Sequence, residues 1–456
     1  MDFDFLFRVE ERFNVGRARA NGVAVWPLIR LDCHFQHINK TVGEAGSAGL
    51  LEKIAGTLRN LFYGITNWIG GYDYVVYTNT TEYRLMDGFL ANKLTVGLDE
   101  LLDEDRILYL EEPTPRHFRA GKRHLHVVSA TPIRLLAYLL KNTIYLRVKG
   151  EGWSVFEEVN KAYDLNINYG DLIRWRLACI KAQEILLKII KPRLVFTTNY
   201  GVYHAKAAHN HGIKVVEFQH GLISKSHPAF QSRLKLDETF YPDHLLVFGE
   251  NDGKLLEDSK IYGGKNIHVI GSRIIEYMHE NREEDEELKS LSRDYELTVA
   301  VTLQWTVQEE LTEFIREAAV LDGEILYLMI PRNRDDVDSM EGFPDNMHYW
   351  TKTGFYEAVA AADYHTSVYS TCSLEAPSLG VQNILADIDG QAEKHLGERL
   401  KDPDVTAYAK TPGEYVKTLR EFQKLDGKKA GEKNKKNIKP GYQYNLERFL
   451  RETKTV

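Results

Sequence analysis

Short apolar, β-branched runs alternate with longer stretches of helical periodicity along most of this chain. Strands are predicted where such runs stop at polar residues, and helices where apolar positions recur every three or four residues. The alternation predicts an α/β protein whose parallel sheets carry helices on both faces. The predicted strands are 72–77, 107–110, 124–128, 194–196, 215–218, 244–249, 297–303, 325–330, 364–369 and 384–388. The predicted helices are 50–69, 171–190, 204–210, 309–320, 354–362 and 444–452.

The strands and helices fall into two series, and 456 residues are too many for one ordinary core. We therefore expect an N-terminal domain over 1–250, a linker over 251–296 and a second domain over 297–425. Residues 426–456 are expected to form a basic tail with a final helix. Within the linker, the charge run 280–287 is expected to be a solvated helix.

Composition restricts the function classes. The formal net charge of −8 argues against a nucleic-acid partner. Three widely spaced cysteines fit a reducing cytosol, and the first residues lack the pattern of a signal peptide. No apolar run is long enough to span a membrane, so a cytoplasmic protein is expected.

The C-terminal tail has the opposite charge. From residue 417 onward there are twelve Lys or Arg and five Asp or Glu. Two interpretations stay open. The tail could touch anionic lipid at the inner face of the cell membrane, or it could be a solvated loop before a last helix.

The strand over 215–218 stops abruptly at Gln219-His220-Gly221. This places an imidazole at the carboxyl end of a parallel strand, where open α/β sheets bind ligands. A histidine has a suitable pKa to accept a proton at neutral pH, so His220 is the candidate catalytic base. Gly221 would allow a sharp turn that leaves space for a substrate. Gln219 and His227, in the same polar stretch, are candidate acceptor-binding residues.

A second polar cluster follows the predicted strand 364–369. Ser370, Thr371 and Ser373 precede Glu375. If a helix begins near Ser373, its free N–H groups and the neighbouring hydroxyls would suit a phosphate or diphosphate. Glu375 could then accept hydrogen bonds from ribose hydroxyls. The alternative is an ordinary capped helix, because Ser and Thr are common N-cap residues.

Other candidates are weaker. Glu82 and Arg84 follow the predicted strand 72–77 and could meet an acceptor. His204 and His209 do not share a helix face and have no carboxylate beside them, so no metal site is predicted. No cofactor is expected either.

Three segments carry a resemblance to known families. Residues 370–380, STCSLEAPSLG, resemble the nucleotide-binding segment of GT-B glycosyltransferases and of the non-hydrolysing UDP-GlcNAc 2-epimerases. Residues 217–221, EFQHG, and 241–249, YPDHLLVFG, resemble bacterial capsular and surface polysaccharide biosynthesis proteins, including Kdo-, sialyl- and glycerophosphate-transferase-like members. The resemblance implies a GT-B architecture, with two Rossmann-like domains facing across a cleft.

The resemblance also implies roles for residues. Gln304 and Thr306 lie where the first turn of such a nucleotide-sugar domain meets phosphates. Sialyltransferase-like relatives carry a His-Pro pair where this chain has Ile330 and Pro331, which puts a CMP-linked donor in doubt. Arg332 or Arg334 could supply positive charge to a phosphate instead.

The leading hypothesis is a metal-independent glycosyltransferase that uses a nucleotide-sugar as substrate. It would transfer the sugar to a hydroxyl of a surface polysaccharide or lipid-linked glycan acceptor. The alternatives are a UDP-sugar epimerase-like enzyme and a non-catalytic carbohydrate-assembly subunit.

Overall fold

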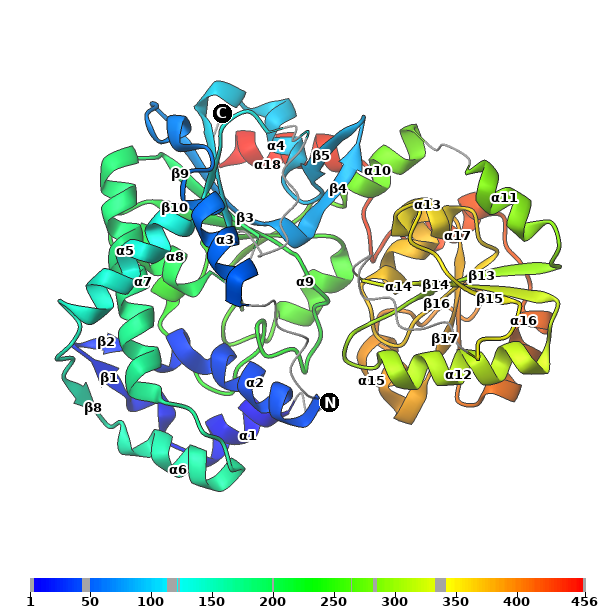
Figure 1. The fold of residues 1–456 in the computed structure, drawn as a ribbon, viewed down its shortest axis with the longest axis horizontal. Helices are drawn as coiled ribbons and strands as arrows, with labels where there is room; N and C mark the ends of the chain where they lie inside the picture. The colour runs from blue at the N-terminus through cyan, green and yellow to red at the C-terminus, as the bar shows by residue number, and fades with distance from the viewer. Residues whose placement is uncertain are drawn as a thin grey trace. The chain divides into compact units, whose positions relative to one another are not determined.

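The computed structural model describes residues 4–42, 50–112, 121, 124–198, 201–263, 265–281, 285–332 and 342–453. These residues form two compact units, each built from segments that are not contiguous in the chain (Figure 1). Unit 1 contains residues 1–247, 253–269 and 443–456, and unit 2 contains 248–252 and 270–442.

Unit 1 is centred on a parallel sheet with the strand order β12-β11-β10-β9-β3-β6-β7. Its strands are mostly apolar and buried on both faces, as expected for a sheet covered by helices. The strands are β3 (Tyr74–Asn79), β6 (Ile107–Glu112), β7 (Val127–Ser129), β9 (Leu194–Thr197), β10 (Lys214–Phe218), β11 (His244–Val247) and β12 (Asn266–Val269).

Helices and short antiparallel strands complete unit 1. One small sheet has the order β2-β1-β8, and β4 pairs with β5. These strands are β1 (Arg19–Ala20), β2 (Val23–Ala24), β4 (Tyr83–Met86), β5 (Phe89–Asn92) and β8 (Gly150–Glu151). The helices are α1 (Phe5–Arg12), α2 (Trp26–Val42), α3 (Leu50–Leu61), η2 (Ile65–Trp68), α4 (Val96–Leu101), α5 (Thr131–Asn142), α6 (Ser154–Tyr163), α7 (Tyr169–Ile190), α8 (Val202–His209) and α18 (Tyr442–Glu452), while α9 (Glu250–Leu256) runs across the boundary of the units.

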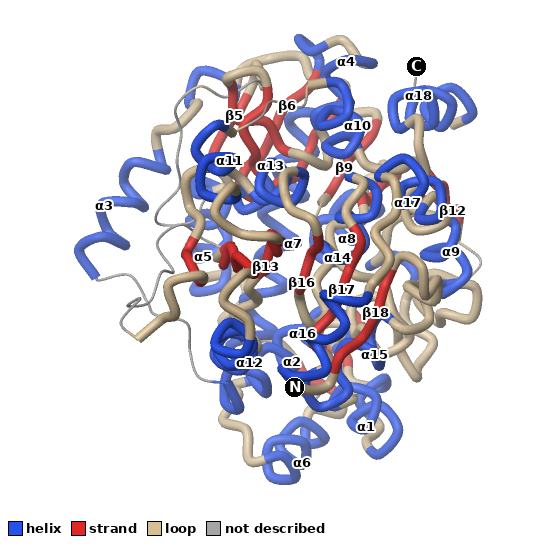
Figure 2. The backbone as a smooth tube through the Cα atoms, turned by 90° about the vertical axis from the view of Figure 1, so that its right-hand side faces the viewer, coloured by secondary structure: helices blue, strands red, loops and turns tan. Residues whose placement is uncertain are grey.

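Unit 2 contains a six-stranded parallel sheet with the order β15-β14-β13-β16-β17-β18. Figure 2 shows β16, β17 and β18 side by side, and β14 is buried at every position. The strands are β13 (Leu297–Thr302), β14 (Ile325–Ile330), β15 (Met347–Tyr349), β16 (Tyr364–Thr366), β17 (Gln382–Ala386) and β18 (Thr406–Ala409). The helices are α10 (Arg273–Glu280), α11 (Glu286–Ser292), α12 (Gln308–Leu321), α13 (Phe355–Ala360), α14 (Cys372–Glu375), η6 (Ala376–Leu379), α15 (Gln391–Leu396), α16 (Pro412–Glu421) and α17 (Gly427–Asn434).

The segment predicted as a basic tail folds against both units. In unit 2, the Asn434 side-chain amide donates to the Leu374 carbonyl at 2.7 Å and to the Ser378 hydroxyl at 2.8 Å. In unit 1, the Phe449 ring lies 4.6 Å from the ring of His268. Several of its cations are ion-paired, including Lys433 with carboxylates of the loop before β18. Much of the basic charge therefore lies on a packed part of the protein.

Gly271 allows a close backbone approach in unit 2. Its φ of +92° is in the region that favours glycine, and a Cβ atom here would lie 2.1 Å from the Lys439 carbonyl oxygen. We expect Gly271→Ala to lower the free energy of unfolding by at least about 2 kcal/mol, because both the φ angle and the clash oppose the methyl group. Urea denaturation measures this change. Gly413→Ala in α16, which has nothing within 4 Å, is the control. Equal effects of the two substitutions would contradict the prediction.

Candidate functional site

The strand order of unit 2 contains a topological switch point. From β13 the chain steps through β14 and β15 toward one edge of the sheet, whereas β16, β17 and β18 extend to the other edge. The connections after β13 and β16 therefore diverge at the carboxyl end of two adjacent strands. Open α/β sheets bind their ligands at such a position.

Four of the predicted donor-binding residues lie in these two connections. The Gln304 side-chain oxygen accepts a hydrogen bond from the backbone N–H of Tyr369 at 2.9 Å. The Thr306 hydroxyl is 2.8 Å from the Tyr369 hydroxyl. Ser370 and Thr371 follow Tyr369 directly and are half-buried. The structure thus brings Gln304 and Thr306 together with the Ser370 loop, across 63 residues or more of sequence.

The end of β16 differs from the prediction for a physical reason. The strand was expected to reach residue 369 but ends at Thr366. The Ser367 hydroxyl donates to the Thr302 carbonyl at 3.0 Å and to the Gln304 side chain at 3.3 Å. These bonds, with the one from Tyr369 to Gln304, turn the chain toward the connection after β13 instead of continuing the ladder.

Ser373 and Glu375 are more deeply placed than a ligand-facing role suggests. Both are buried, and the Glu375 carboxylate accepts a hydrogen bond from the Tyr356 hydroxyl at 3.0 Å. The expected helix is only the four residues of α14, followed by the tighter turn η6. Its first N–H groups are already used, because Cys372 donates to the Ser370 hydroxyl and the Ser373 N–H donates to the Ser370 carbonyl.

Arg332 follows β14 at the same edge of the sheet, separated from the strand by Pro331. Its side chain is exposed. Arg334, the other cation suggested by the sequence, lies outside the described residues. Strand β14 pairs with β13, so Arg332 lies close in sequence to a strand end beside the switch point.

Asp387 is a polar residue of this edge that the sequence analysis did not select. It follows β17 and is buried, and its Oδ1 accepts the backbone N–H of Glu393 at 3.0 Å. Within the described residues its Oδ2 has no hydrogen-bond partner. The available signal was a pair of acidic residues, Asp387 and Asp389, directly after an apolar strand. His365 in β16 is also buried, and burial lowers its pKa to about 4 while it bridges Thr302 and Asn383.

In unit 1, β10 leads directly into the predicted base. Gln219 is fully buried, its N–H donates to the Leu246 carbonyl at 2.8 Å, and its side-chain amide donates to the Gly221 carbonyl at 3.0 Å. These bonds fix the turn that carries His220. Burial lowers the pKa of His220 to about 4, although the Glu82 carboxylate and a hydrogen bond to the Phe218 backbone oppose this shift. At neutral pH the imidazole is therefore uncharged and able to accept a proton.

The three other acceptor-binding candidates have different surroundings. Glu82 forms an ion pair with Lys93 at 3.7 Å. Its carboxylate also acts electrostatically on the imidazole of His220, so Glu82 lies near the candidate base. The Arg84 guanidinium donates to the carbonyls of Thr81 at 3.0 Å and Tyr83 at 2.7 Å, within its own turn. The His227 ring accepts the Ala229 N–H at 3.3 Å.

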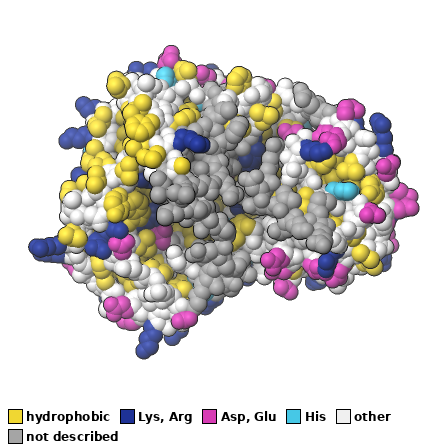
Figure 3. Space-filling model, in the orientation of Figure 1, with side chains coloured by type: hydrophobic (Ala, Val, Ile, Leu, Met, Phe, Trp, Pro, Cys, Tyr) yellow, Lys and Arg dark blue, Asp and Glu magenta, His cyan; other side chains and the backbone are white. Residues whose placement is uncertain are grey.

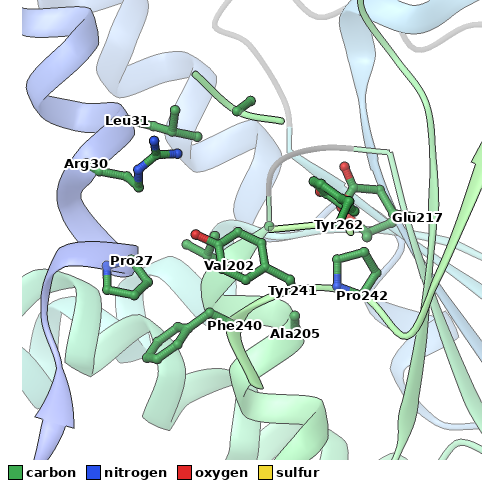
Figure 4. A pocket seen from close by; sticks show the side chains of 13 residues that line it. Pro27, Arg30, Leu31, Val202, Ala205, Glu217, Phe240, Tyr241, Pro242 and Tyr262 are labelled. Carbon is green, nitrogen blue, oxygen red and sulfur yellow. The ribbon is translucent and has the colours of Figure 1, made fainter. Parts of the chain in front are cut away.

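A buried carboxyl group, Glu217, lies in β10 two residues before Gln219. Burial raises its pKa to about 8, and the Tyr262 hydroxyl is 3.5 Å from it. Figure 4 shows Glu217 and Tyr262 beside a cavity whose opposite side carries Arg30. The cavity is about 10 Å³, room for about one water, so it cannot hold a sugar. Glu217 was not selected from the sequence, although a carboxylate within a mainly apolar strand is a signal of such burial.

The polar stretch after His220 is anchored by a buried ion pair. Glu10 of α1 and Arg30 of α2 lie 2.9 Å apart, with both side chains almost fully buried. Arg30 donates to the carbonyls of Pro228 and Gln231, and Glu10 accepts from the Ser232 hydroxyl at 2.9 Å. The first two helices of the chain therefore hold the segment that follows the candidate base.

Within the described ranges, no group of three or more His, Cys, Asp and Glu side chains is placed to hold a metal ion. His204 instead stacks on Tyr77 at 3.9 Å, and burial lowers its pKa to about 4. No helix within those ranges is both long and apolar enough to cross a bilayer.

Comparison with known proteins identifies the fold. No family model and no curated protein matches the sequence. Among solved structures, a proposed UDP-N-acetylglucosamine 2-epimerase from Listeria monocytogenes has a TM-score of 0.52 and 12% identity, covering 85% of this chain and 96% of its own. The trehalose 6-phosphate synthase of Burkholderia multivorans has a TM-score of 0.51 and 12% identity, and the match covers 85% of this chain and 97% of that protein. The calicheamicin glycosyltransferase CalG4 has a TM-score of 0.50 and 13% identity, and the match covers 84% of this chain and 98% of that protein. The predicted α/β class with two Rossmann-like domains is confirmed, and the architecture is that of GT-B proteins.

Proposed function

We propose that this protein is a glycosyltransferase that binds a nucleotide-sugar on unit 2 and transfers the sugar to a hydroxyl of a surface polysaccharide or lipid-linked glycan. One observation carries the proposal. Polar residues predicted to contact the donor converge at the switch point of the unit 2 sheet, where Gln304 and Thr306 contact the loop of Ser370. A switch point supplies both the space and the strand ends that a nucleotide needs.

The proposed reaction uses His220 as the base. The acceptor hydroxyl would lose its proton to the neutral imidazole as its oxygen bonds to the anomeric carbon, and the bond from that carbon to the nucleotide diphosphate would break. Negative charge would then develop on the leaving diphosphate. Arg332 and the hydroxyls of Ser370 and Thr371 are the groups available to stabilise it.

An epimerase-like reaction on a UDP-sugar is the second candidate function. The observation that favours it is the likeness of the fold to the Listeria protein, which covers most of both chains. The two candidates differ in one requirement. A transferase needs an acceptor, whereas interconversion of the sugar does not, so product analysis with and without added glycan separates them.

Nucleotide binding is the first test. Calorimetry against UDP, GDP, CMP and their sugars is expected to reveal one preferred nucleotide. Arg332→Ala should weaken that binding by about tenfold or more, because a charge-assisted hydrogen bond to phosphate is lost. Arg316→Ala in α12 is the matched control, since Arg316 is also exposed on unit 2 and pairs only with nearby Glu313. The absence of nucleotide binding by folded protein would overturn the proposal and favour a non-catalytic subunit.

A further inference from the structure

Unit 1 presents a row of large apolar side chains to solvent on α3, η2 and α5, which we call the apolar strip. Leu58 lies on α3 and Phe62 follows directly after that helix, one member lies on η2, and three lie on one face of α5. Helices α3 and α5 contact each other, and η2 contacts β7, which directly precedes α5. Figure 3 shows hydrophobic side chains gathering on the upper left of the view, with Lys and Arg beside them. The members are Leu58, Phe62, Ile65, Leu135, Tyr138 and Leu139.

Unit 1 exposes more large apolar side chains than unit 2 does among the described residues. Phe62 is 64% exposed and Leu139 is 60% exposed. Among the described residues of unit 2, the large apolar side chains that are exposed are Trp305, Val320 and Leu321. Contiguous apolar surface on a folded protein usually marks a binding surface, whereas isolated exposed residues do not.

Positive charge accompanies the strip. Residues 124–150 contain four Lys or Arg and no Asp or Glu, in a chain whose formal net charge is −8. Two of these cations, Arg134 and Lys141, are paired with carboxylates of neighbouring elements. Within the part of the chain that the structure describes, no ion pair forms with Arg147, Lys149 or Arg59. The segment that carries Arg147 and Lys149 directly follows α5 and also exposes Ile144 and Leu146.

We propose that the apolar strip docks this protein on an anionic lipid bilayer. Helix faces that combine apolar side chains with Lys and Arg insert at the boundary between lipid headgroups and acyl chains. Anionic headgroups would neutralise Arg59, Arg147 and Lys149 while the acyl region covers Phe62 and Leu139.

Charge argues against a second copy of the chain as the occupant. In a two-fold dimer the same surface meets itself, so the uncompensated cations of the strip would face their own copies. The proposed lipid surface is separate from the C-terminal segment 426–456, and it does not depend on the nucleotide site of unit 2.

Flotation of the full chain with lipid vesicles tests the proposal. Wild type is expected to float with vesicles of phosphatidylcholine and phosphatidylglycerol, less so as salt rises, and weakly with phosphatidylcholine alone. Phe62→Asp/Leu139→Asp should lower the bound fraction at least about tenfold, because two apolar side chains no longer enter the bilayer. Val320→Asp/Leu321→Asp on α12 is the matched control and should bind like wild type.

Charge reversal separates the strip from the C-terminal segment. Arg147→Glu/Lys149→Glu should weaken binding to the anionic vesicles, whereas Lys428→Glu/Lys429→Glu in α17 should not. A wild type that stays unbound, or an apolar-strip variant that binds as well as wild type, overturns the proposal. Dimerisation that the strip variant abolishes, without lipid binding, overturns it in favour of a second copy. Circular dichroism on each variant checks that it is folded. Nucleotide calorimetry on the same variants shows whether the unit 2 site is intact, so failure of lipid binding can be told apart from failure of the transferase proposal.

Discussion

His220→Ala is expected to lower kcat for sugar transfer by about 10²–10⁴-fold, the usual contribution of a positioned general base. Nucleotide affinity should stay within about twofold of wild type, because the residues proposed to bind the donor belong to unit 2. The measurement is initial rate with donor and acceptor, paired with calorimetry for the nucleotide. His211→Ala is the control, since His211 is an exposed histidine of unit 1 that lies after α8 and outside the candidate site. Equal losses for the two variants would argue against a catalytic base at residue 220.

The pH dependence gives a second readout of the same residue. Burial lowers the pKa of His220 to about 4, so the free protein carries an uncharged imidazole at pH 6 and above. As pH falls through about 4 the ring takes up a proton and can no longer act as a base. The acid limb of kcat/KM is therefore expected near pH 4 and not near the ordinary histidine value of 6.5. An acid limb at 6.5, or one unchanged in His220→Ala, would contradict the assignment.

Glu10→Ala is expected to destabilise the protein by about 3–5 kcal/mol, because it leaves the buried Arg30 without its counter-ion. The same substitution removes the acceptor for the Trp26 side chain at 3.0 Å and for the Arg233 N–H at 2.6 Å. Urea denaturation measures the loss. Glu11→Ala provides the control, because the Glu11 side chain is 59% exposed and pairs with an exposed arginine.

A double variant makes the electrostatic origin testable. Glu10→Met/Arg30→Met removes both charges and retains apolar volume, so it should be more stable than Glu10→Ala. If the double variant is at least as unstable as Glu10→Ala, the buried charge is not the cause. A loss of less than about 1 kcal/mol in Glu10→Ala itself would place this pair with ordinary surface ion pairs.

Strands and helices with a clear hydrophobic pattern were predicted correctly from the sequence. The strand over 325–330 was predicted with the bounds that β14 has, because six consecutive apolar residues leave few alternatives. Helix α2 is not among the predicted helices, because Pro27 stands within its first apolar residues and proline usually interrupts a helix. In the structure Pro27 is the second residue of α2, where its missing N–H breaks no helical hydrogen bond.

The sequence predicts which residues of the candidate site follow strands, but not which side chains tertiary packing brings together. A polar residue at a strand end can be found by inspection, which is how His220, Gln304 and Ser370 were selected. The burial of Glu375 could not be found in this way, because its partner Tyr356 comes from α13 and is brought there by tertiary packing. For the same reason the electrostatic effect of Glu82 on His220 has no local signal, because it depends on tertiary packing of distant segments.

The discontinuous division of the chain has a consequence for synthesis in the cell. Helix α18 belongs to unit 1, where Phe449 packs on His268 of the edge strand β12, yet it follows all of unit 2 in the sequence. A ribosome that releases about 5–20 residues per second delivers β12 many seconds before α18. During that interval the face of β11 and β12 that carries His244 and His268 lacks the helix that covers it. Completion of unit 1 therefore waits until unit 2 has been synthesised.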